Sequence, residues 1–444
     1  SFCNGGGAKG RHQTVFGQCS TEHVQEETMT KTKAFNIDKS LVVSAYRRVK
    51  TSAGAAGIDK QSLADFDKRL VDNLYKIWNR LSSGSYFPPA VKAVAIPKKL
   101  GGERILGIPT VSDRIAQTVV KLAFEPQVEP HFLADSYGYR PNKSALDAIG
   151  VTRKRCWYYD WVLEFDIKGL FDNIPHELIM KAVDKHNPAR WVKLYIQRWL
   201  TAPMVMSDGE VRARTMGTPQ GGVISPLLAN LFMHYVFDKW LAKYYPKVPW
   251  YRYADDGILH CHSEAEATEM REVLRKRFSE CGLEMHPEKT RVIYCKDGSR
   301  KGDYEHTMFD FLGYTFRRRV VKNVKRNSLF VSFTPAASKS ALKAMRREIK
   351  ATGIRKRVDL SIEQIAKWIN PKLNGWINYY GRYTCSELYS VFRYINKALV
   401  RWGRKKYKML SRYKTRASKF LEEMAKRSPQ LFAHWRLKMR GGLV

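Results

Sequence analysis

The sequence has little that would tie it to a membrane or to the secretory route. No stretch approaches the roughly 18 uninterrupted apolar residues of a membrane-spanning helix, and the most apolar one, residues 223–237, is interrupted by serine, proline, asparagine and histidine. The N-terminus contains no hydrophobic signal core. The seven cysteines are scattered, with no Cys-x-x-Cys pair. This argues against a disulfide framework or a zinc site and favours a reducing compartment.

Acidic residues are scarce compared with basic ones. Lysine and arginine number 78 and aspartate and glutamate 42, which gives a formal net charge of +36 over 444 residues. An excess of this size indicates a polyanionic partner. Nucleic acid is the favoured class, and an acidic membrane surface comes second. The apolar fraction of 44% is that of a globular protein, and the length suffices for about two to four domains.

The patterns along the chain predict four segments. Residues 1–38 are polar and lack periodicity, which predicts a flexible leader. Residues 39–156 combine helical patterns, including one over 63–81, with a basic hairpin around 100–104. Residues 157–334 alternate strands and helices, including one long helix over 225–245, and predict an α+β fold with an antiparallel sheet. Residues 335–444 are helical in pattern, and from 339 onward they hold 27 basic against 6 acidic residues.

Two carboxylate motifs carry the strongest chemical signal. Asp255 and Asp256 are adjacent at the expected tip of a strand–turn–strand hairpin, where like charges raise each other's pKa and need a compensating cation. Asp166 lies near the end of the apolar strand expected over 161–167, where a carboxylate is costly unless it is paired or metal-bound. Oxygen-only ligands suit Mg²⁺. A solvated turn and a helix cap at the strand end are the structural alternatives.

A glycine-rich loop, residues 217–222, precedes an apolar helical stretch. Its glycines permit close approach of the backbone to a ligand, and Gln220 offers both a hydrogen-bond donor and an acceptor. The alternative is an ordinary loop before a helix.

The order of these motifs resembles that of reverse transcriptases, and among them the group II intron-encoded proteins. A Tyr-x-Asp-Asp tetrapeptide alone is a weak signal, but the ordered series is specific. The matching blocks are GAAGID (54–59), IPKKLGGERILGIPTVSDRIAQ (96–117), SYGYRPNKSALDAI (136–149), DIKGLFDNIPHELI (166–179), GTPQGGVISPLLANL (217–231), YADD (253–256), HPEKT (286–290), FLGYTF (311–316) and NGWINYYGRY (374–383).

The resemblance implies a right-hand polymerase fold. Residues 39–156 would form an N-terminal extension and the fingers, residues 157–334 the palm with part of the fingers, and residues 335–444 the thumb and the maturase (X) domain. It further implies that Asp166, Asp255 and Asp256, together with Ile167, form a site for two Mg²⁺ ions, with Mn²⁺ as a substitute. One ion would lower the pKa of the primer 3′-hydroxyl and the other would stabilise the leaving pyrophosphate.

The resemblance also assigns residues to the incoming deoxynucleotide. Lys98 and Arg104 would grip the triphosphate from the fingers hairpin, and Gln220 would contact the nucleotide or the template. Phe171 falls at the position that discriminates between sugars, and Lys289 could protonate pyrophosphate. Solvated basic side chains and ordinary core packing are the alternatives for these residues.

The basic C-terminal segment is expected to bind RNA phosphates. The residues chosen for this role are Arg404, Lys405, Lys406, Lys408, Arg412 and Lys414. The implied partners are a group II intron RNA, an RNA template with a DNA primer, target DNA and deoxynucleotides, with no membrane. The implied location is a nucleoid-associated ribonucleoprotein in the bacterial cytoplasm, with an organelle as second choice. No cysteine–histidine cluster follows the X-like block. In this respect the sequence resembles the lineage that lacks a C-terminal endonuclease.

Three other functions compete with an intron-encoded polymerase and maturase. A domesticated reverse transcriptase would serve defence or DNA repair without an intron partner, and the X-like block argues against it. A splicing factor without catalysis is disfavoured because all three carboxylates remain. An RNA-dependent RNA polymerase would prefer a glycine before the aspartate pair and a polar residue in place of Phe171.

Overall fold

The computed structural model describes residues 33–97, 102–323 and 326–437, so most of the expected leader, and Lys98, lie outside the described residues. The chain divides into two compact units. One unit holds residues 1–130 and 174–228, and the other holds residues 131–173 and 229–444. Helix α10 (Ser225–Met233) runs from the first unit into the second. None of the described helices is long and apolar enough to cross a membrane.

The described part of the first unit contains a four-stranded sheet and six α-helices besides the start of α10. Strands β1 (Val91–Pro97) and β2 (Glu103–Ile108) form the expected antiparallel hairpin, and β4 pairs in parallel with β1. Helix α5 (Val111–Val128) is buried along most of its length. The remaining elements are α2 (Lys39–Ser52), α3 (Leu63–Asp67), α4 (Leu70–Ser83), α8 (His176–Asp184), α9 (Arg190–Thr201), β4 (Met204–Val205) and β5 (Val211–Arg212).

The prediction of a single helix over 63–81 is wrong. The helical pattern is divided into α3, which begins with a capping box at Ser62, and α4, which begins after Arg69. Arg69 has φ −129° and ψ 48°, outside the helical region, so the backbone turns between two amphipathic segments. The apolar spacing continued across this break, and periodicity alone therefore could not reveal it.

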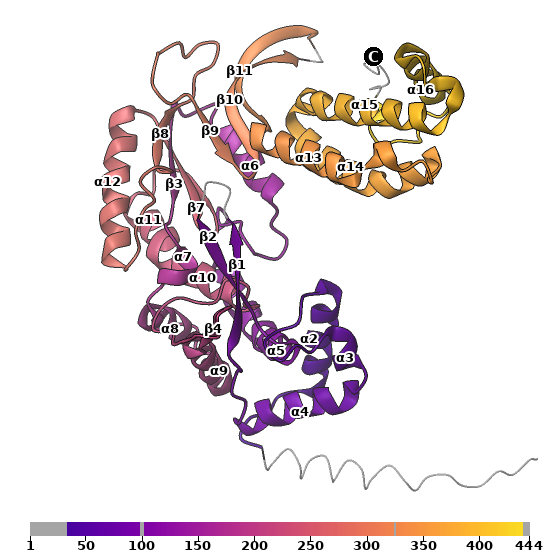
Figure 1. The fold of residues 1–444 in the computed structure, drawn as a ribbon. Helices are drawn as coiled ribbons and strands as arrows, with labels where there is room; N and C mark the ends of the chain where they lie inside the picture. Colours follow the sequence, from indigo (N-terminus) through magenta and orange to yellow (C-terminus); the bar gives the residue numbers. More distant parts are fainter. Residues whose placement is uncertain (1–32, 98–101, 324–325, 438–444) are drawn as a thin grey trace, which may run out of the picture. The chain divides into compact units, whose positions relative to one another are not determined.

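A four-stranded antiparallel sheet lies at the centre of the second unit. Its strand order is β6 (Trp250–Tyr253), β7 (Asp256–Cys261), β3 (Trp161–Asp166) and β8 (Arg291–Tyr294), as the α+β prediction required. Helix α12 (Glu264–Glu280) packs along this sheet (Figure 1). Strand β3 is buried on both faces, since Val162 and Leu163 are both fully inaccessible. A polar group on this strand is therefore held in an apolar environment.

The long helix expected over 225–245 is interrupted. Between α10 and α11 (Lys239–Tyr244), residues His234–Asp238 form a π-helical turn. Such turns insert one extra residue per helical turn and are frequent near functional sites. The side chain of Asp238, the last residue of this turn, is fully buried, and it binds Arg252 of strand β6.

A second antiparallel sheet and the C-terminal helices complete the second unit. The sheet contains β9 (Met308–Phe311), β10 (Tyr314–Asn323) and β11 (Ser328–Ala337), and the shorter helices are α6 (Ala145–Arg155) and α7 (Leu170–Asn173). Beyond the sheet the described chain is helical, as expected. The four C-terminal helices are α13 (Lys339–Thr352), α14 (Ile362–Thr384), α15 (Tyr389–Lys406) and α16 (Lys414–Arg427).

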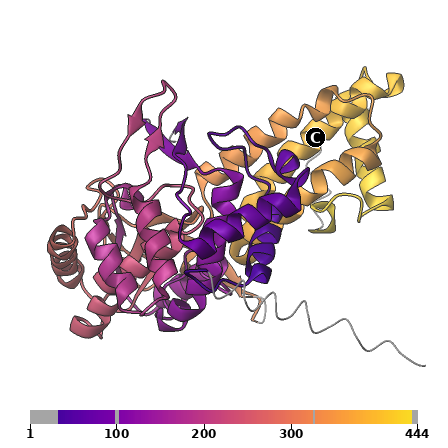
Figure 2. The same ribbon diagram turned by 90° about the horizontal axis from the view of Figure 1, so that it is seen from below.

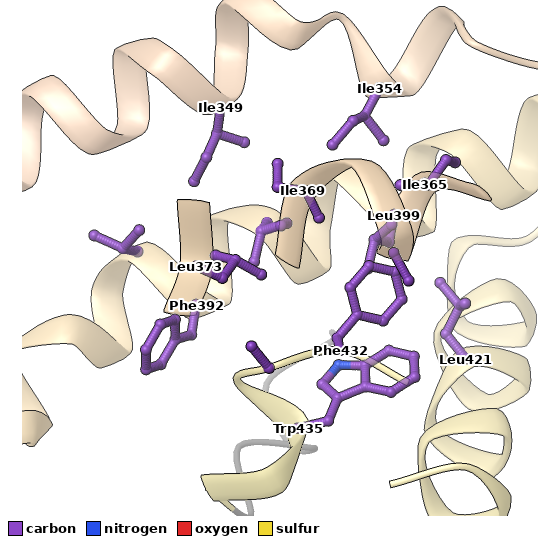
Figure 3. Close-up of a cluster of buried hydrophobic side chains, with 14 of the residues drawn as sticks. Ile349, Ile354, Ile365, Ile369, Leu373, Phe392, Leu399, Leu421, Phe432 and Trp435 are labelled. Atoms are coloured by element: carbon purple, nitrogen blue, oxygen red, sulfur yellow. The ribbon is translucent and has the colours of Figure 1, made fainter. Parts of the chain in front are cut away.

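The C-terminal helices enclose their own hydrophobic core. They pack together in both views of the ribbon (Figures 1 and 2), and the side chains of Ile354, Leu399 and Phe432 converge between them (Figure 3). Trp402 is fully buried, and its indole Nε1 donates to the carbonyl oxygen of Arg357 at 2.9 Å. This anchors the short 3₁₀ turn Ile354–Lys356 and the loop after it to α15.

Candidate active site

Strand pairing brings two of the predicted carboxylates together. In the β3–β7 ladder, Asp166 and Asp256 are direct cross-strand partners. Asp255 precedes Asp256 in the turn between β6 and β7. Directly opposed residues in an antiparallel pair have side chains on the same face. The site therefore comes from the register of two strands, as the predicted strand and hairpin required.

The turn that carries Asp255 and Asp256 has an unusual backbone. Tyr253 pairs with Asp256, which leaves a two-residue turn, and Ala254 has φ +59°. Glycine normally takes this conformation at no steric cost, whereas alanine is strained there. A side chain on Gly138 would lie 2.5 Å from the nitrogen of Ala254, so the neighbouring loop requires glycine. The turn is held in place by packing rather than by its own preference.

A buried arginine, Arg252, is hydrogen-bonded to the backbone of this turn. Nε and Nη2 of Arg252 donate to the two carboxylate oxygens of Asp238 at 2.9 and 2.8 Å. Nη1 donates to Oδ1 of Asn230 and to the carbonyl oxygen of Ala254, both at 3.0 Å, and Nη2 donates to the hydroxyl of Ser136 at 3.0 Å. All five N–H groups of the guanidinium are thus used. Arg252 and Asp238 are fully buried, so the ion pair is shielded from solvent.

The charges around Asp256 oppose its ionisation. Burial, followed by the nearby charge of Asp255 and a hydrogen bond with Asp166, raises the pKa of Asp256 to about 8. Lys289 binds Asp166, with its Nζ 2.8 Å from Oδ2. Partial burial favours a lower pKa for Lys289, but its bond to Asp166 and the charges of Asp256 and Asp255 outweigh it, and the pKa is raised. The three carboxylates can therefore be ionised together only at a cost, and a bound cation would favour the ionised form of Asp256.

The donor set is that of a hard divalent ion. Its side chains offer only carboxylate oxygens, which Mg²⁺ prefers to nitrogen or sulfur. Among the described residues, no group of three or more His, Cys, Asp or Glu side chains is arranged so that it could hold a metal ion by itself. Mg²⁺ needs fewer protein ligands than such a group provides, because it keeps several waters and takes substrate phosphates as further ligands. The residues present fit such an ion.

Aromatic rings pack near the turn that carries Asp255 and Asp256. Phe171, on α7 directly after the Asp166 strand, is 7% exposed and stacks edge-on against Tyr139 at 6.5 Å between ring centroids. The ring of Tyr139 also lies 6.4 Å from that of Tyr253, which precedes the turn. The ring of Phe171 is therefore held in place within the same unit as the three aspartates. Its role in sugar selection stays a prediction.

The predicted nucleotide contacts of the first unit also meet. Nε of Arg104 on β2 donates to Oε1 of Gln220, and the backbone N–H of Gly107 donates to the carbonyl oxygen of Gln220 at 2.7 Å. Gly221 has φ +113°, and a side chain there would lie 2.4 Å from the carbonyl oxygen of Gly107. The glycine-rich loop can therefore lie directly on the basic hairpin. Lys98 lies outside the described residues.

Sequence reasoning missed Arg252 and Asp238. The available signal was an arginine between aromatic residues in an apolar strand, a place where an unpaired charge is not tolerated. The neighbouring His260 and Cys261 belong to the core. Burial lowers the pKa of His260 to about 3 and raises that of Cys261 to about 12, so both are neutral at pH 7.

Comparison with known families identifies the class of protein. Residues 96–316, which contain all three aspartates, match the family described as reverse transcriptase (RNA-dependent DNA polymerase). Residues 342–420 match the maturase-specific domain of group II introns. The site thus lies in a reverse transcriptase domain, and the maturase match covers most of the basic C-terminal helices.

Individual relatives agree with this class. The chain is 33% identical over 328 residues to protein YkfC of Escherichia coli strain K12, covering 63% of this chain and 80% of YkfC. It is 31% identical over 212 residues to the group II intron-encoded protein LtrA of Lactococcus lactis, covering 47% of this chain but only 35% of LtrA. A putative COX1/OXI3 intron 1 protein of Saccharomyces cerevisiae is 30% identical over 47% of this chain and 25% of that protein. The chain belongs to the group II intron-encoded reverse transcriptase and maturase family.

Proposed function

We propose that this protein copies RNA into DNA with two Mg²⁺ ions at Asp166, Asp255 and Asp256, with the backbone of Ile167 as a further ligand. The observation that carries the proposal is the β3–β7 register, which opposes Asp166 and Asp256 at a place where Asp256 ionises readily only if a cation is bound. Bound Mg²⁺ would activate the primer 3′-hydroxyl and stabilise the leaving pyrophosphate, and Mn²⁺ would substitute for it. In the right-hand arrangement, residues 157–334 serve mainly as palm, and 39–156 as the N-terminal extension and fingers.

The chain's own residues position the reactants. Arg104, Gln220 and Lys98 hold the incoming deoxynucleotide, and the planar guanidinium of Arg104 suits a phosphate. Lys289, now bonded to Asp166, keeps its proton and can deliver it to the departing pyrophosphate. Phe171 blocks the space that a ribose 2′-hydroxyl would need.

The experiment that tests the metal site is primer extension on an RNA template with Asp255→Asn. The variant should lose Mg²⁺-dependent extension by at least about 10³-fold, because it removes charge where positioning and charge neutralisation do most of the work. Asp303→Asn is the matched control, since Asp303 is 98% exposed and pairs only with Lys296 among the contacts described. Extension by Asp255→Asn at the control's rate would refute the site.

Sugar selection is tested at Phe171. Phe171→Leu keeps an apolar side chain in the packed position, whereas Phe171→Ala opens a space beside the substrate. The alanine variant should incorporate ribonucleotides more readily, and the leucine variant should lie between it and the native protein. An unchanged ratio of ribo- to deoxynucleotide use in both would assign Phe171 to packing alone.

The maturase match favours a second function, binding of a group II intron RNA to assist its splicing and retrohoming. We place the RNA contacts on residues 335–444, which form the thumb and maturase part. The proposed contacts are Arg404, Lys405, Lys406, Lys408, Arg412 and Lys414. A nucleoid-associated ribonucleoprotein in the bacterial cytoplasm fits this function. A domesticated enzyme without an intron is not favoured, because it would not need a maturase domain.

A further inference from the structure

Two adjacent cavities lie on the surface of the C-terminal helices, between the 3₁₀ turn Ile354–Lys356 and α15. The larger, about 480 Å³, is lined by Arg355, Lys356, Arg401, Arg404, Lys405 and Ser411. The smaller, about 60 Å³, shares Arg355 and Arg401 and adds Lys350, Lys397 and Tyr394 among its lining residues. Together they are called the basic recess. Seven cations and no carboxylate line it.

The charges of the basic recess are not neutralised by the protein. Within the described part of the chain, no carboxylate forms an ion pair with Arg355, Lys397, Arg401 or Lys405. The acidic residues of this region are engaged elsewhere: Asp359 binds Arg357, and Glu348 binds Lys372. By contrast, the arginines of α12 pair with glutamates of their own helix. The recess therefore concentrates positive charge that an anion from outside would neutralise.

The backbone beneath the recess is fixed. Ile354 is 1% exposed within the hydrophobic core (Figure 3), and Gly353 before it takes φ +64°, which ends α13. Nζ of Lys406 donates to the carbonyl oxygens of Val358 and Leu360 at 2.8 and 3.0 Å. The guanidinium of Arg404 donates to the carbonyl oxygen of Ser411, 2.9 Å from Nη2. These bonds attach the turn and both loops to α15, so the cations project from a rigid base.

The spacing of the cations suits an extended polyanion. Lys397, Arg401 and Lys405 follow one another at four-residue intervals on α15, so they form a row along one face, with a rise of about 6 Å at each step. Arg355 and Lys356 face this row from the 3₁₀ turn. A single small anion would engage only part of this row, whereas a nucleic-acid backbone presents successive phosphates along it.

We propose that the basic recess is a binding site for the phosphodiester backbone of RNA, with Arg355, Lys397, Arg401 and Lys405 as the phosphate contacts. This inference rests on the proposed RNA-binding function of the C-terminal helices and adds residues that the sequence did not single out. It also separates two groups among the earlier candidates: Lys405 contacts RNA, whereas Lys406 holds the loop that forms the recess. The site reads backbone charge rather than base sequence.

The test compares two triple variants of the full chain with equal charge loss. The recess variant is Arg355→Gln, Arg401→Gln and Lys405→Gln, and the control is Arg416→Gln, Lys419→Gln and Lys426→Gln, three exposed cations of α16. Affinity for a labelled oligo(U) RNA and for a stem-loop RNA is measured from 50 to 200 mM salt. Each phosphate contact of a single strand contributes about 0.7 to the salt slope, so the recess variant should lose about 2 units and bind about tenfold more weakly.

The outcomes separate this inference from the proposed function. If only the recess variant loses RNA affinity, for both RNAs and with an unchanged melting temperature, the result supports the recess as a binding site for the RNA backbone. Loss confined to the stem-loop would assign the recess to folded RNA, and loss confined to oligo(U) to single strands. Equal loss in both variants, or loss only in the control, overturns the recess but keeps RNA binding by this region. Native protein whose RNA affinity does not change with salt overturns the proposed phosphate contacts as a whole.

Discussion

The β6–β7 hairpin and the C-terminal helices use positive charge in opposite ways. In the hairpin, Arg252 is fully buried and spends all five N–H groups on partners within the protein. In the C-terminal helices, the cations of the basic recess lie at the surface without carboxylate partners among the described residues. A buried charge is tolerated only when groups of the protein itself pair with it, whereas an exposed charge is solvated and remains available to a ligand. The first arrangement fixes geometry, and the second provides affinity.

The largest expected effect comes from breaking the buried pair. Arg252→Met leaves Asp238 buried without its partner, which should lower the free energy of unfolding by about 3–5 kcal/mol. The double variant Arg252→Met and Asp238→Leu removes both charges and should recover most of that loss. Polymerase activity should stay low in the double variant, because the carbonyl oxygen of Ala254 has lost its donor. Urea unfolding and primer extension measure the two quantities.

If the double variant regained native activity, the pair would serve stability alone. The comparison between the hairpin and the helices would then concern burial only, and not the positioning of the turn that carries Asp255 and Asp256.

The second prediction concerns pH in the metal-free protein. Burial, with Asp255 and Asp166 adding to it, raises the pKa of Asp256 from 3.8 to about 8 in the folded state. The folded protein therefore holds this proton more tightly than the unfolded chain. Its contribution to stability is full below pH 3.8 and is lost as the pH rises through 8. With EDTA present, stability should fall on the order of a few kcal/mol over this range.

Asp256→Asn should show a smaller fall between pH 5 and pH 8.5, measured by urea unfolding, while Asp303→Asn should behave like the native protein. Glu164, whose pKa burial raises to about 8, contributes a fall that remains in all three proteins. Added Mg²⁺ should restore stability at pH 8.5 in the native protein and less so in Asp256→Asn. Identical curves for native protein and Asp256→Asn would contradict the electrostatic account of the site.

The sequence revealed the features that depend on residue type and on the order of the motifs, and it revealed less of those that depend on tertiary packing. The three aspartates, the hairpin around 100–104, and the helical basic segment were all visible as local patterns. Two helix boundaries were not, because apolar periodicity runs unchanged through the break at Arg69 and through the π-helical turn ending at Asp238. The Arg252–Asp238 pair and the recess bring together residues that are not adjacent in sequence. Such contacts follow from tertiary packing, which no local pattern contains.

The third prediction tests the strained turn. Ala254→Gly removes the cost of a left-handed conformation and should raise stability by about 1 kcal/mol. Ala254→Val should instead destabilise the protein, because a β-branched residue is poorly tolerated at φ +59° and the site is only 6% exposed. Thermal unfolding of both variants measures the effect. A valine variant as stable as the native protein would mean that the turn relaxes freely and that Arg252 does not hold it.

The smallest expected effect separates two adjacent lysines of α15. Lys406 donates to two carbonyl oxygens, whereas Lys405 faces the recess without a carboxylate partner in the described ranges. Lys406→Met should lower the free energy of unfolding by about 1 kcal/mol, since it removes bonds at a partly solvated site. Lys405→Met should leave stability unchanged within about 0.5 kcal/mol but weaken RNA binding and lower its salt slope by about 0.7. Melting temperature and RNA affinity, measured on both variants, give opposite orders of effect if one lysine is structural and the other binds phosphate. If one variant lost more than the other in both melting temperature and RNA affinity, the two lysines would not have separate roles. The contrast between charges paired within the protein and charges available to a ligand would then not hold within a single helix.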